Sequence, residues 1–226
     1  MTGETSASSR GVALTTLRER VRRCPRCSEP VAGRTTVVFG EGPADAALMV
    51  VGQAPGVNED RQGLPLVGAP ARLLRDALGV AGLRVEDVFV TTVLKYRLPD
   101  NRDPLPDEVE HGLHHLHEQV AIIRPRVLCP LGGFAAKLLR GDPEGIRTVH
   151  GRAEIHDVGG VAVRVLPLFD PAAALYGRLS TDALRADVAR LPELLALPVP
   201  DQREAVAPTG PDDPDPGRPP TQLGLF

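Results

Sequence analysis

Four short apolar runs, rich in β-branched residues and hydrophobic on both alternating faces, recur along this chain of 226 residues. Strands that are apolar on both faces are typical of parallel sheets covered by helices on each side. The runs are residues 46–51, 88–94, 126–131 and 161–168. Stretches with helical lengths and spacing lie between and after them, at residues 71–81, 107–123, 133–139 and 181–195. This alternation predicts an α/β fold: a three-layer α/β/α sandwich around a small, mostly parallel sheet of four strands.

One folded domain is expected, from residue 11 to residue 197. A chain of this length can bury a full core, and contents of 42% hydrophobic and 24% charged residues are ordinary for a globular protein. Residues 1–10 are small and polar, so we expect disorder there, followed by a helix over residues 12–23. Residues 198–220 are rich in Pro, Asp and Gly, which predicts a disordered linker, and residues 221–226 form an apolar tip.

Composition also limits where the protein can be located in the cell and which partners it can bind. No stretch is apolar enough to span a membrane, and the N-terminus lacks a signal-peptide core. Three cysteines, an odd number, argue against a disulfide framework. We therefore expect a cytoplasmic monomer, associated with the nucleoid if it binds DNA. The net charge of −3 comes entirely from residues 198–226, and a neutral body neither supports nor excludes DNA binding through a local basic patch.

The connection after the first apolar run, residues 50–68, is the strongest sign of a functional site. It contains four glycines, two prolines and the acidic pair Glu59 and Asp60. Glycines let a backbone approach a ligand closely, and prolines make the same loop rigid. A simple strand-to-helix connection needs only about 2–6 residues. The spacing does not fit a dinucleotide or nucleotide-triphosphate loop, so we predict a different ligand site at the carboxyl end of this strand.

The same stretch resembles the first motif of the family 4 uracil-DNA glycosylases, Gly-Glu-x-Pro-Gly-x-x-Glu-Asp-x-x-Gly-x-Pro-Phe-Val-Gly. The matching positions are Gly52, Pro55, Gly56, Glu59, Asp60, Gly63, Pro65, Val67 and Gly68. The resemblance extends over about residues 12–195. It implies a uracil-DNA-glycosylase-like sandwich and a DNA base-excision enzyme. Such an enzyme flips uracil or a related deaminated base out of DNA and hydrolyses its N-glycosidic bond.

Several positions that the resemblance marks as functional carry other residues here. Gln53 stands where glutamate is common, and Leu66 replaces the phenylalanine that stacks on the flipped base. Thr92 replaces the asparagine that reads the uracil edge, and Asp170 replaces the histidine that donates to a uracil oxygen. These departures fit three hypotheses: a uracil glycosylase, a glycosylase for another lesion, or a catalytically impaired DNA-binding repair accessory.

The candidate catalytic residues are Glu59, Asp170 and Gln53. Glu59 is the best surviving carboxylate near the sugar, where it would polarise water or stabilise positive charge; a loop cap explains it equally well. An ionised Asp170 would repel the departing base, whereas a protonated one, its pKa raised by burial, could donate to it. Asp170 could alternatively support the sugar cation or orient water. The candidate base-binding residues are Ala54, Pro55, Gly56, Leu66 and Thr92.

Two further segments are candidates for contact with DNA phosphates. Arg97, Asn101 and Arg102 lie in a Pro-rich stretch, residues 97–106, that suits a rigid loop against a backbone. A solvent-exposed loop without a ligand is the alternative. Gly132 and Gly133 begin a predicted helix, where they permit close packing or backbone N–H contact with a phosphate.

The resemblance also implies an iron–sulfur cluster on four cysteines, of which this chain retains two. Cys24 and Cys27, in Cys-Pro-Arg-Cys, match the first two ligands. Tyr96 replaces the third, and the fourth falls near Gly112. Cys129 lies in a predicted buried strand and is most simply a core residue. Two thiolates do not hold a standard cluster, which makes the cluster doubtful.

Histidines crowd the predicted helix where the last cluster ligand would lie. His111 and His115 are four residues apart, so they could share a face and bind zinc together with Cys24 and Cys27. The interpretation that we favour from sequence is a solvated His-rich face beside a vestigial Cys pair that packs or is exposed.

The last five residues resemble the pentapeptide Gln-Leu-x-Leu-Phe by which bacterial repair proteins bind the replication sliding clamp. The residues concerned are Gln222, Leu223, Leu225 and Phe226. An apolar tip at the end of a disordered acidic linker suits capture by an apolar pocket on a partner. The predicted partners are therefore DNA containing a damaged base and the bacterial sliding clamp.

Overall fold

A computed structural model describes residues 2–28, 35–175 and 177–202. The predicted clamp peptide and most of the predicted linker lie outside these residues. None of the described helices is long and apolar enough to cross a membrane.

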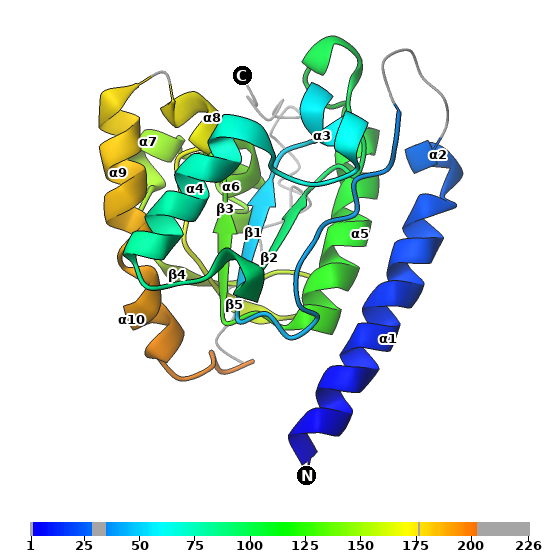
Figure 1. Ribbon diagram of the computed structural model, residues 1–226, viewed down its shortest axis with the longest axis horizontal. Helices are drawn as coiled ribbons and strands as arrows, with labels where there is room; N and C mark the ends of the chain where they lie inside the picture. Colours follow the sequence, from blue (N-terminus) through cyan, green and yellow to red (C-terminus); the bar gives the residue numbers. More distant parts are fainter. Residues whose placement is uncertain (1, 29–34, 176, 203–226) are drawn as a thin grey trace, which may run out of the picture.

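The core is a five-stranded sheet with the strand order β2-β1-β3-β5-β4 (Figure 1). The strands are β1 (Leu48–Gly52), β2 (Val88–Thr92), β3 (Val127–Pro130), β4 (Glu154–Asp157) and β5 (Ala162–Val165). β1 pairs in parallel with β2 and β3, and β3 with β5, whereas β4 is antiparallel to β5. The mostly parallel sheet is confirmed, but the expected count of four strands is wrong. β4 was missed because it is a polar edge strand, Glu-Ile-His-Asp, without the apolar pattern of the others.

Helices cover both faces of the sheet, which confirms the three-layer sandwich. Along β1, Leu48 and Val50 pack on one side, and Met49 and Val51 on the other. The side of Met49 is covered by α1 (Thr2–Arg22), α5 (Pro106–Ile123) and α6 (Gly132–Arg140), and the opposite side by α4 (Gly68–Val80), α9 (Arg178–Val188) and α10 (Leu191–Ala196). The short elements are α2 (Pro25–Ser28), α3 (Val57–Gln62), η1 (Val85–Asp87), η2 (Pro99–Asn101), α7 (Ile146–Val149) and α8 (Pro171–Ala174). Both faces of every central strand are therefore buried, as the apolar runs require.

The first helix differs from the prediction in where it begins. α1 begins at Thr2, inside the stretch for which we expected disorder, rather than at residue 12. Leu14, Leu17 and Val21 anchor its second half in the core. Extending an anchored helix adds one hydrogen bond per residue and needs no new nucleus, so the polar start can continue the same helix.

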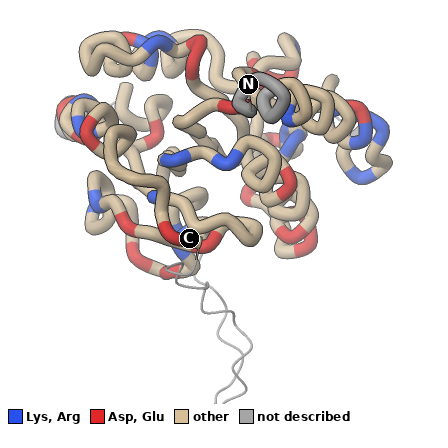
Figure 2. The backbone as a smooth tube through the Cα atoms, turned by 90° about the horizontal axis from the view of Figure 1, so that it is seen from below, with Lys and Arg blue, Asp and Glu red and all other residues tan. Residues whose placement is uncertain are grey.

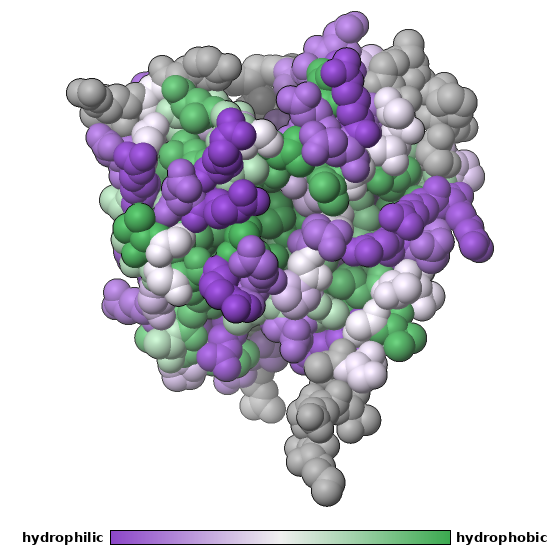
Figure 3. All heavy atoms as spheres, viewed as in Figure 1, coloured by the Kyte–Doolittle hydropathy of each residue, from purple (hydrophilic) through white to green (hydrophobic). Residues whose placement is uncertain are grey.

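The surface of the described body carries no single-sign face in these views. Figure 2 shows Lys and Arg interspersed with Asp and Glu over the helices. In Figure 3, hydrophobic surface lies between groups of hydrophilic side chains. Contact with a polyanion would therefore depend on local groups around a site rather than on a broad electrostatic field.

Candidate active site

A cavity of about 510 Å³ opens at the carboxyl ends of the parallel strands. Its walls come from the loop after β1, the end of β2, η2 with the residues on either side of it, and the start of α8. The predicted site residues that line it are Gln53, Ala54, Pro55, Gly56, Glu59, Leu66, Thr92, Asn101, Arg102 and Asp170. Arg97, Gly132 and Gly133 do not line it. Segments more than a hundred residues apart thus meet here, because parallel strands place their carboxyl ends at one edge.

The glycine-rich loop is held in shape by Glu59. Its Oε1 accepts a hydrogen bond of 2.9 Å from the backbone N–H of Val67, across the turn that follows α3. A Cβ on Gly56 would lie 2.8 Å from Glu59 Oε2, so a larger residue at position 56 would displace this carboxylate from its present position. Glu59 therefore fastens the loop, and its side chain also lines the cavity.

Asp60, beside Glu59, stabilises the fold and does not line the cavity. Its side chain is buried, and its oxygens accept backbone hydrogen bonds from Thr35 and Thr36 at 2.8–3.0 Å. Burial opposes the charge, but these hydrogen bonds outweigh it and lower the pKa of Asp60. The carboxylate thereby ties the segment before β1 to the loop after it.

Leu66 adopts a backbone conformation that is uncommon for its residue type. Its φ is +50°, in the left-handed region that a branched side chain seldom occupies. Its side chain lines the cavity and also packs against the core on the Leu48 side of the sheet. Leu66 therefore supplies an apolar wall where the resemblance predicted an aromatic ring.

Thr92 presents less hydrogen-bonding capacity to the cavity than its hydroxyl implies. Its Oγ1 donates to the carbonyl of Leu94 at 2.6 Å, so its proton is already in use. The oxygen retains an acceptor lone pair, and the residue is 6% exposed. Thr92 can accept a hydrogen bond from a ligand N–H but has no proton left to donate.

Below Thr92 lies a buried lysine that sequence reasoning passed over. The Lys95 amine donates to Thr91 Oγ1 at 2.8 Å and to Gln119 Oε1 at 2.6 Å. Burial lowers the pKa of Lys95 to about 7, and the nearby Cys27 thiol partly opposes this shift. A charged residue at the end of an apolar run was the available signal. Lys95 thus joins the end of β2, which lines the cavity, to α5.

Asp170 caps α8 and faces the same cavity. Its Oδ1 accepts a hydrogen bond of 2.7 Å from the backbone N–H of Ala172, which fixes the orientation of the carboxyl group. Burial raises the pKa of Asp170 more than the Ala172 and Ala173 N–H groups lower it, and the charge of Glu59 raises it further. The protonated form is thus favoured beyond that of an ordinary aspartate. A Cβ on Gly132 would lie 3.2 Å from the Cβ of Asp170, so glycine makes room for this cap.

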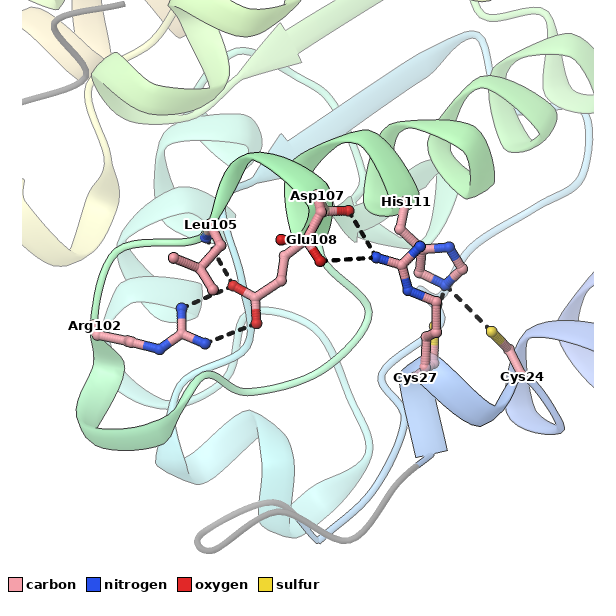
Figure 4. Close-up of polar contacts among 8 residues, drawn as sticks. Cys24, Cys27, Arg102, Leu105, Asp107, Glu108 and His111 are labelled. Atoms are coloured by element: carbon pink, nitrogen blue, oxygen red, sulfur yellow. Dashed lines mark hydrogen bonds and ion pairs between the residues drawn. The ribbon is translucent and has the colours of Figure 1, made fainter. Parts of the chain in front are cut away.

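The predicted DNA-contact residues are tied to one another and to α5. Arg97 Nε donates to Asn101 Oδ1 at 3.1 Å. Arg102 forms two hydrogen bonds of 2.8 Å with the two carboxylate oxygens of Glu108, and Glu108 Oε2 also accepts from the N–H of Leu105 (Figure 4). This bidentate pair holds Arg102 at the cavity wall by a geometry that lysine could not reproduce.

A second cluster joins α2 to the first half of α5. His111 Nε2 lies 3.2 Å from Cys24 Sγ and 3.4 Å from Cys27 Sγ, with all three side chains converging in Figure 4. The ligand atoms of Cys24, Cys27, His111 and His115 all lie within 4.8 Å of one another. This is a Cys/His cluster that could hold a metal ion.

The interpretation of these histidines as a solvated face is wrong for His115. α5 packs against α1, which leaves His115 only 5% exposed, while the His114 side chain remains 68% exposed. Burial, with the neighbouring His111, Lys95 and other cations, lowers the pKa of His115 to about 4. Burial also lowers the pKa of His111. Both rings are therefore neutral at neutral pH, the state in which imidazole binds metals.

Comparison with known proteins agrees with this architecture. The profile of the uracil DNA glycosylase superfamily matches residues 39–191, which include the sheet and all the cavity walls. The chain belongs to the uracil DNA glycosylase superfamily. The type-4 uracil-DNA glycosylase of Archaeoglobus fulgidus is 39% identical to it over 165 residues, covering 71% of this chain and 83% of the relative.

Other relatives of the same superfamily give a consistent picture. The type-4 uracil-DNA glycosylase of Saccharolobus solfataricus is 35% identical over 188 residues, covering 81% of this chain and 87% of that protein. The type-4 enzyme of Thermotoga maritima is 39% identical over 161 residues, covering 71% and 82%. Membership of the superfamily, inferred from the loop motif, is thereby confirmed.

Proposed function

We propose that this protein is a DNA glycosylase that hydrolyses the N-glycosidic bond of a deaminated base, uracil or a related lesion, extruded from DNA into the cavity. The observation that carries the proposal is the presence of Glu59, Asp170 and Thr92 on the walls of one cavity. Two carboxyl groups in different environments suit two different chemical roles. The relatives' activity on uracil in DNA supports the same reaction class.

In this mechanism Asp170 acts as the protonated partner of the base. Its capped Oδ1 is fixed by Ala172, so Oδ2 carries the proton and donates to a base oxygen as negative charge builds there. Glu59, held by Val67, faces the sugar and stabilises the positive charge that develops there. Water forms the new bond to C1′ while the base departs with the bonding electron pair. Gln53 orients that water through its amide, and the water's proton passes to solvent.

We expect this cavity to discriminate less strictly among bases than a cavity with the asparagine and phenylalanine that the resemblance implies. Thr92 accepts one hydrogen bond from a base N–H, because its own proton is given to Leu94. An asparagine amide would offer a paired donor and acceptor instead. Leu66 covers the base without a ring face. We therefore propose that uracil shares the cavity with other deaminated bases that present a carbonyl beside a ring N–H, hypoxanthine among them.

The deciding experiment is single-turnover base release from oligonucleotides that contain uracil or hypoxanthine. We expect release by the wild-type chain, a large loss in Glu59→Gln and Asp170→Ala, and wild-type rates in the matched control Asp182→Asn on the exposed face of α9. Wild-type rates in both cavity variants would contradict the assigned roles. Absence of release from every substrate would contradict the glycosylase proposal itself.

A second candidate function is a catalytically impaired repair accessory that binds DNA and is recruited to the sliding clamp. It is favoured by the simultaneous change of Gln53, Leu66, Thr92 and Asp170 and by the terminal Gln-Leu-Gly-Leu-Phe.

Deletion of residues 222–226 should abolish binding to a purified bacterial clamp and leave DNA binding unchanged. Clamp binding that survives the deletion would refute the peptide assignment. DNA binding without base release would favour the accessory function. In either case we propose that the protein is a monomer associated with the nucleoid.

A further inference from the structure

The Cys/His cluster does not fit the iron–sulfur cluster that the resemblance implied. Tyr96, at the third ligand position, is a buried core residue with 3% exposure. At the fourth, a Cβ on Gly112 would lie 2.8 Å from the carbonyl oxygen of Val93 and 2.8 Å from a methyl group of Leu94. α5 thus lies too close to the chain after β2 for a cysteine there without a backbone shift. Position 96 therefore supplies no thiolate, and position 112 has no room for one.

We infer that Cys24, Cys27, His111 and His115 form a tetrahedral site for a single divalent ion of the zinc class. The inference rests on the geometry of this cluster and does not depend on the proposed glycosylase function. Two thiolates and two imidazoles are a donor set that zinc binds in structural sites, with the spacing of two residues between the cysteines. Binding releases the two thiol protons, and the two thiolates balance the charge of the ion.

The distances support one ion rather than a cluster of several irons. Tetrahedral bonds to zinc separate sulfur and nitrogen ligand atoms by about 3.3–3.8 Å, given bond lengths of about 2.3 and 2.0–2.1 Å. The separations of 3.2 and 3.4 Å from His111 Nε2 to the two sulfurs are close to that value. In a two-iron cluster with mixed ligands, the cysteines and histidines bind different irons. Here both cysteines and His111 converge on one point.

His115 supplies an independent observation. It is 5% exposed, and neither of its ring nitrogens has a hydrogen-bond partner among the residues that the structure describes. A buried polar group without a partner is costly, on the order of 1–3 kcal/mol, unless a ligand satisfies it. Its ring meets that of His111 edge-on, at 4.7 Å between centroids. A metal bond to one nitrogen would satisfy a group that the protein itself leaves unpaired.

The site also has an entry path and a structural consequence. A groove between α1 and α5, lined by Thr16, Arg20 and His114 among others, leads to Cys24, His111 and His115. The ion would fasten α2 to α5 beside the pair of Arg26 and Asp107 (Figure 4). The same first turn of α5 carries Glu108, which holds Arg102. The metal would thereby brace the element that positions one wall of the cavity.

The test is metal analysis of the full-length chain purified without added metal and then loaded with Zn²⁺. We expect about one zinc per chain and no visible absorbance, since zinc has no redox or d-electron transitions. Titration of the metal-free chain with Co²⁺ should produce the visible bands of a tetrahedral thiolate site. Bound iron with sulfide and visible absorbance, or no binding of Zn²⁺ or Co²⁺ at all, would overturn the inference.

Variants assign the ligands. Cys24→Ser and His115→Gln should each lose the bound zinc and the Co²⁺ bands, whereas His114→Gln on the same helix, with an exposed side chain, should keep both. Far-ultraviolet circular dichroism checks that each variant is folded. If a folded Cys24→Ser or His115→Gln chain retains one zinc with an unchanged Co²⁺ spectrum, the proposed ligand set is wrong. Even if a variant fails to fold, the Co²⁺ titration of the wild-type chain still tests the metal site.

Discussion

The cavity and the Cys/His cluster are the two regions in which this chain carries residues other than those that the sequence resemblance implied, and the two sites are built differently. In the cavity, the frame is held by side-chain carboxylates that accept hydrogen bonds from backbone N–H groups, as Glu59 does from Val67 and Asp170 from Ala172. Leu66 adds an apolar wall to this frame. In the cluster, the side-chain atoms are themselves the site. There, Tyr96 is a core residue and Gly112 packs closely against the chain after β2, while His111 and His115 face the two thiols.

This contrast predicts that substitution of a cavity residue changes the rate or the specificity while the loop keeps its shape, whereas substitution of a ligand in the Cys/His cluster removes the metal. The following predictions test each half of that statement, in order of decreasing effect.

The largest effect is expected for Glu59→Gln. The amide oxygen can still accept from Val67, so the loop should keep its shape while its negative charge is lost. We expect base release to fall by about 10²–10³-fold, as when an electrostatic group at a reacting centre is removed, with little change in melting temperature. A rate within a factor of two of wild type would show that Glu59 is a loop fastener alone.

Asp170 should give the rate its pH dependence. Its folded pKa is raised, chiefly by burial, so the proton-donating form is present below that pKa and is lost as pH rises through it. Base release should therefore decline on the alkaline side by about tenfold per pH unit. Asp170→Asn keeps an N–H donor that does not titrate, so its profile should lose this limb. An identical alkaline limb in Asp170→Asn would exclude Asp170 as the donor.

The same raised pKa predicts the pH dependence of folding stability. The folded state binds the Asp170 proton more tightly than the unfolded state does, so the free energy of unfolding should fall as pH rises from the ordinary aspartate pKa through the folded one. Asp170→Asn should flatten that part of the curve in urea titrations. A slope unchanged by the substitution would assign it to other groups.

Removal of the metal should affect stability more moderately, because the domain has its own core. A chelator should lower the melting temperature of the zinc-loaded chain by about 5–10 °C, which corresponds to about 2–3 kcal/mol for a domain of this size. Cys24→Ser should melt at the lower temperature and no longer respond to the chelator, while His114→Gln should behave as wild type. A chelator response that persists in Cys24→Ser would place the metal elsewhere.

The smallest effect is expected for Leu66→Phe, which restores a ring face to the cavity wall. Stacking of a base on an aromatic side chain contributes about 1–3 kcal/mol. The uncommon φ of +50° at this residue should reduce that gain. We expect about fivefold tighter binding of an oligonucleotide with an extruded base analogue, measured by fluorescence anisotropy. Unchanged binding would mean that the ring cannot reach the base from this backbone conformation.

Much of the fold was predictable because burial leaves a local signature. The apolar runs that became β1, β2, β3 and β5 are mainly hydrophobic on both alternating faces, and this pattern needs no knowledge of distant residues. β4 escaped prediction because an edge strand obtains its hydrogen bonds from β5 and does not need an apolar face. The early start of α1 was missed because helix extension depends on the anchored half that follows.

The candidate site likewise has features that the local sequence predicts and features that it does not. The sequence by itself determined the sandwich, the glycine-rich loop after β1 and the Cys24–Cys27 pair, since spacing and periodicity are properties of neighbouring residues. Only the tertiary structure decided that a half-buried Asp170 shares a cavity with Glu59, that the proton of Thr92 is given to Leu94, and that His115 points inward with unpaired nitrogens. Burial, pKa and hydrogen-bond satisfaction arise when distant segments pack together, and no local pattern records them.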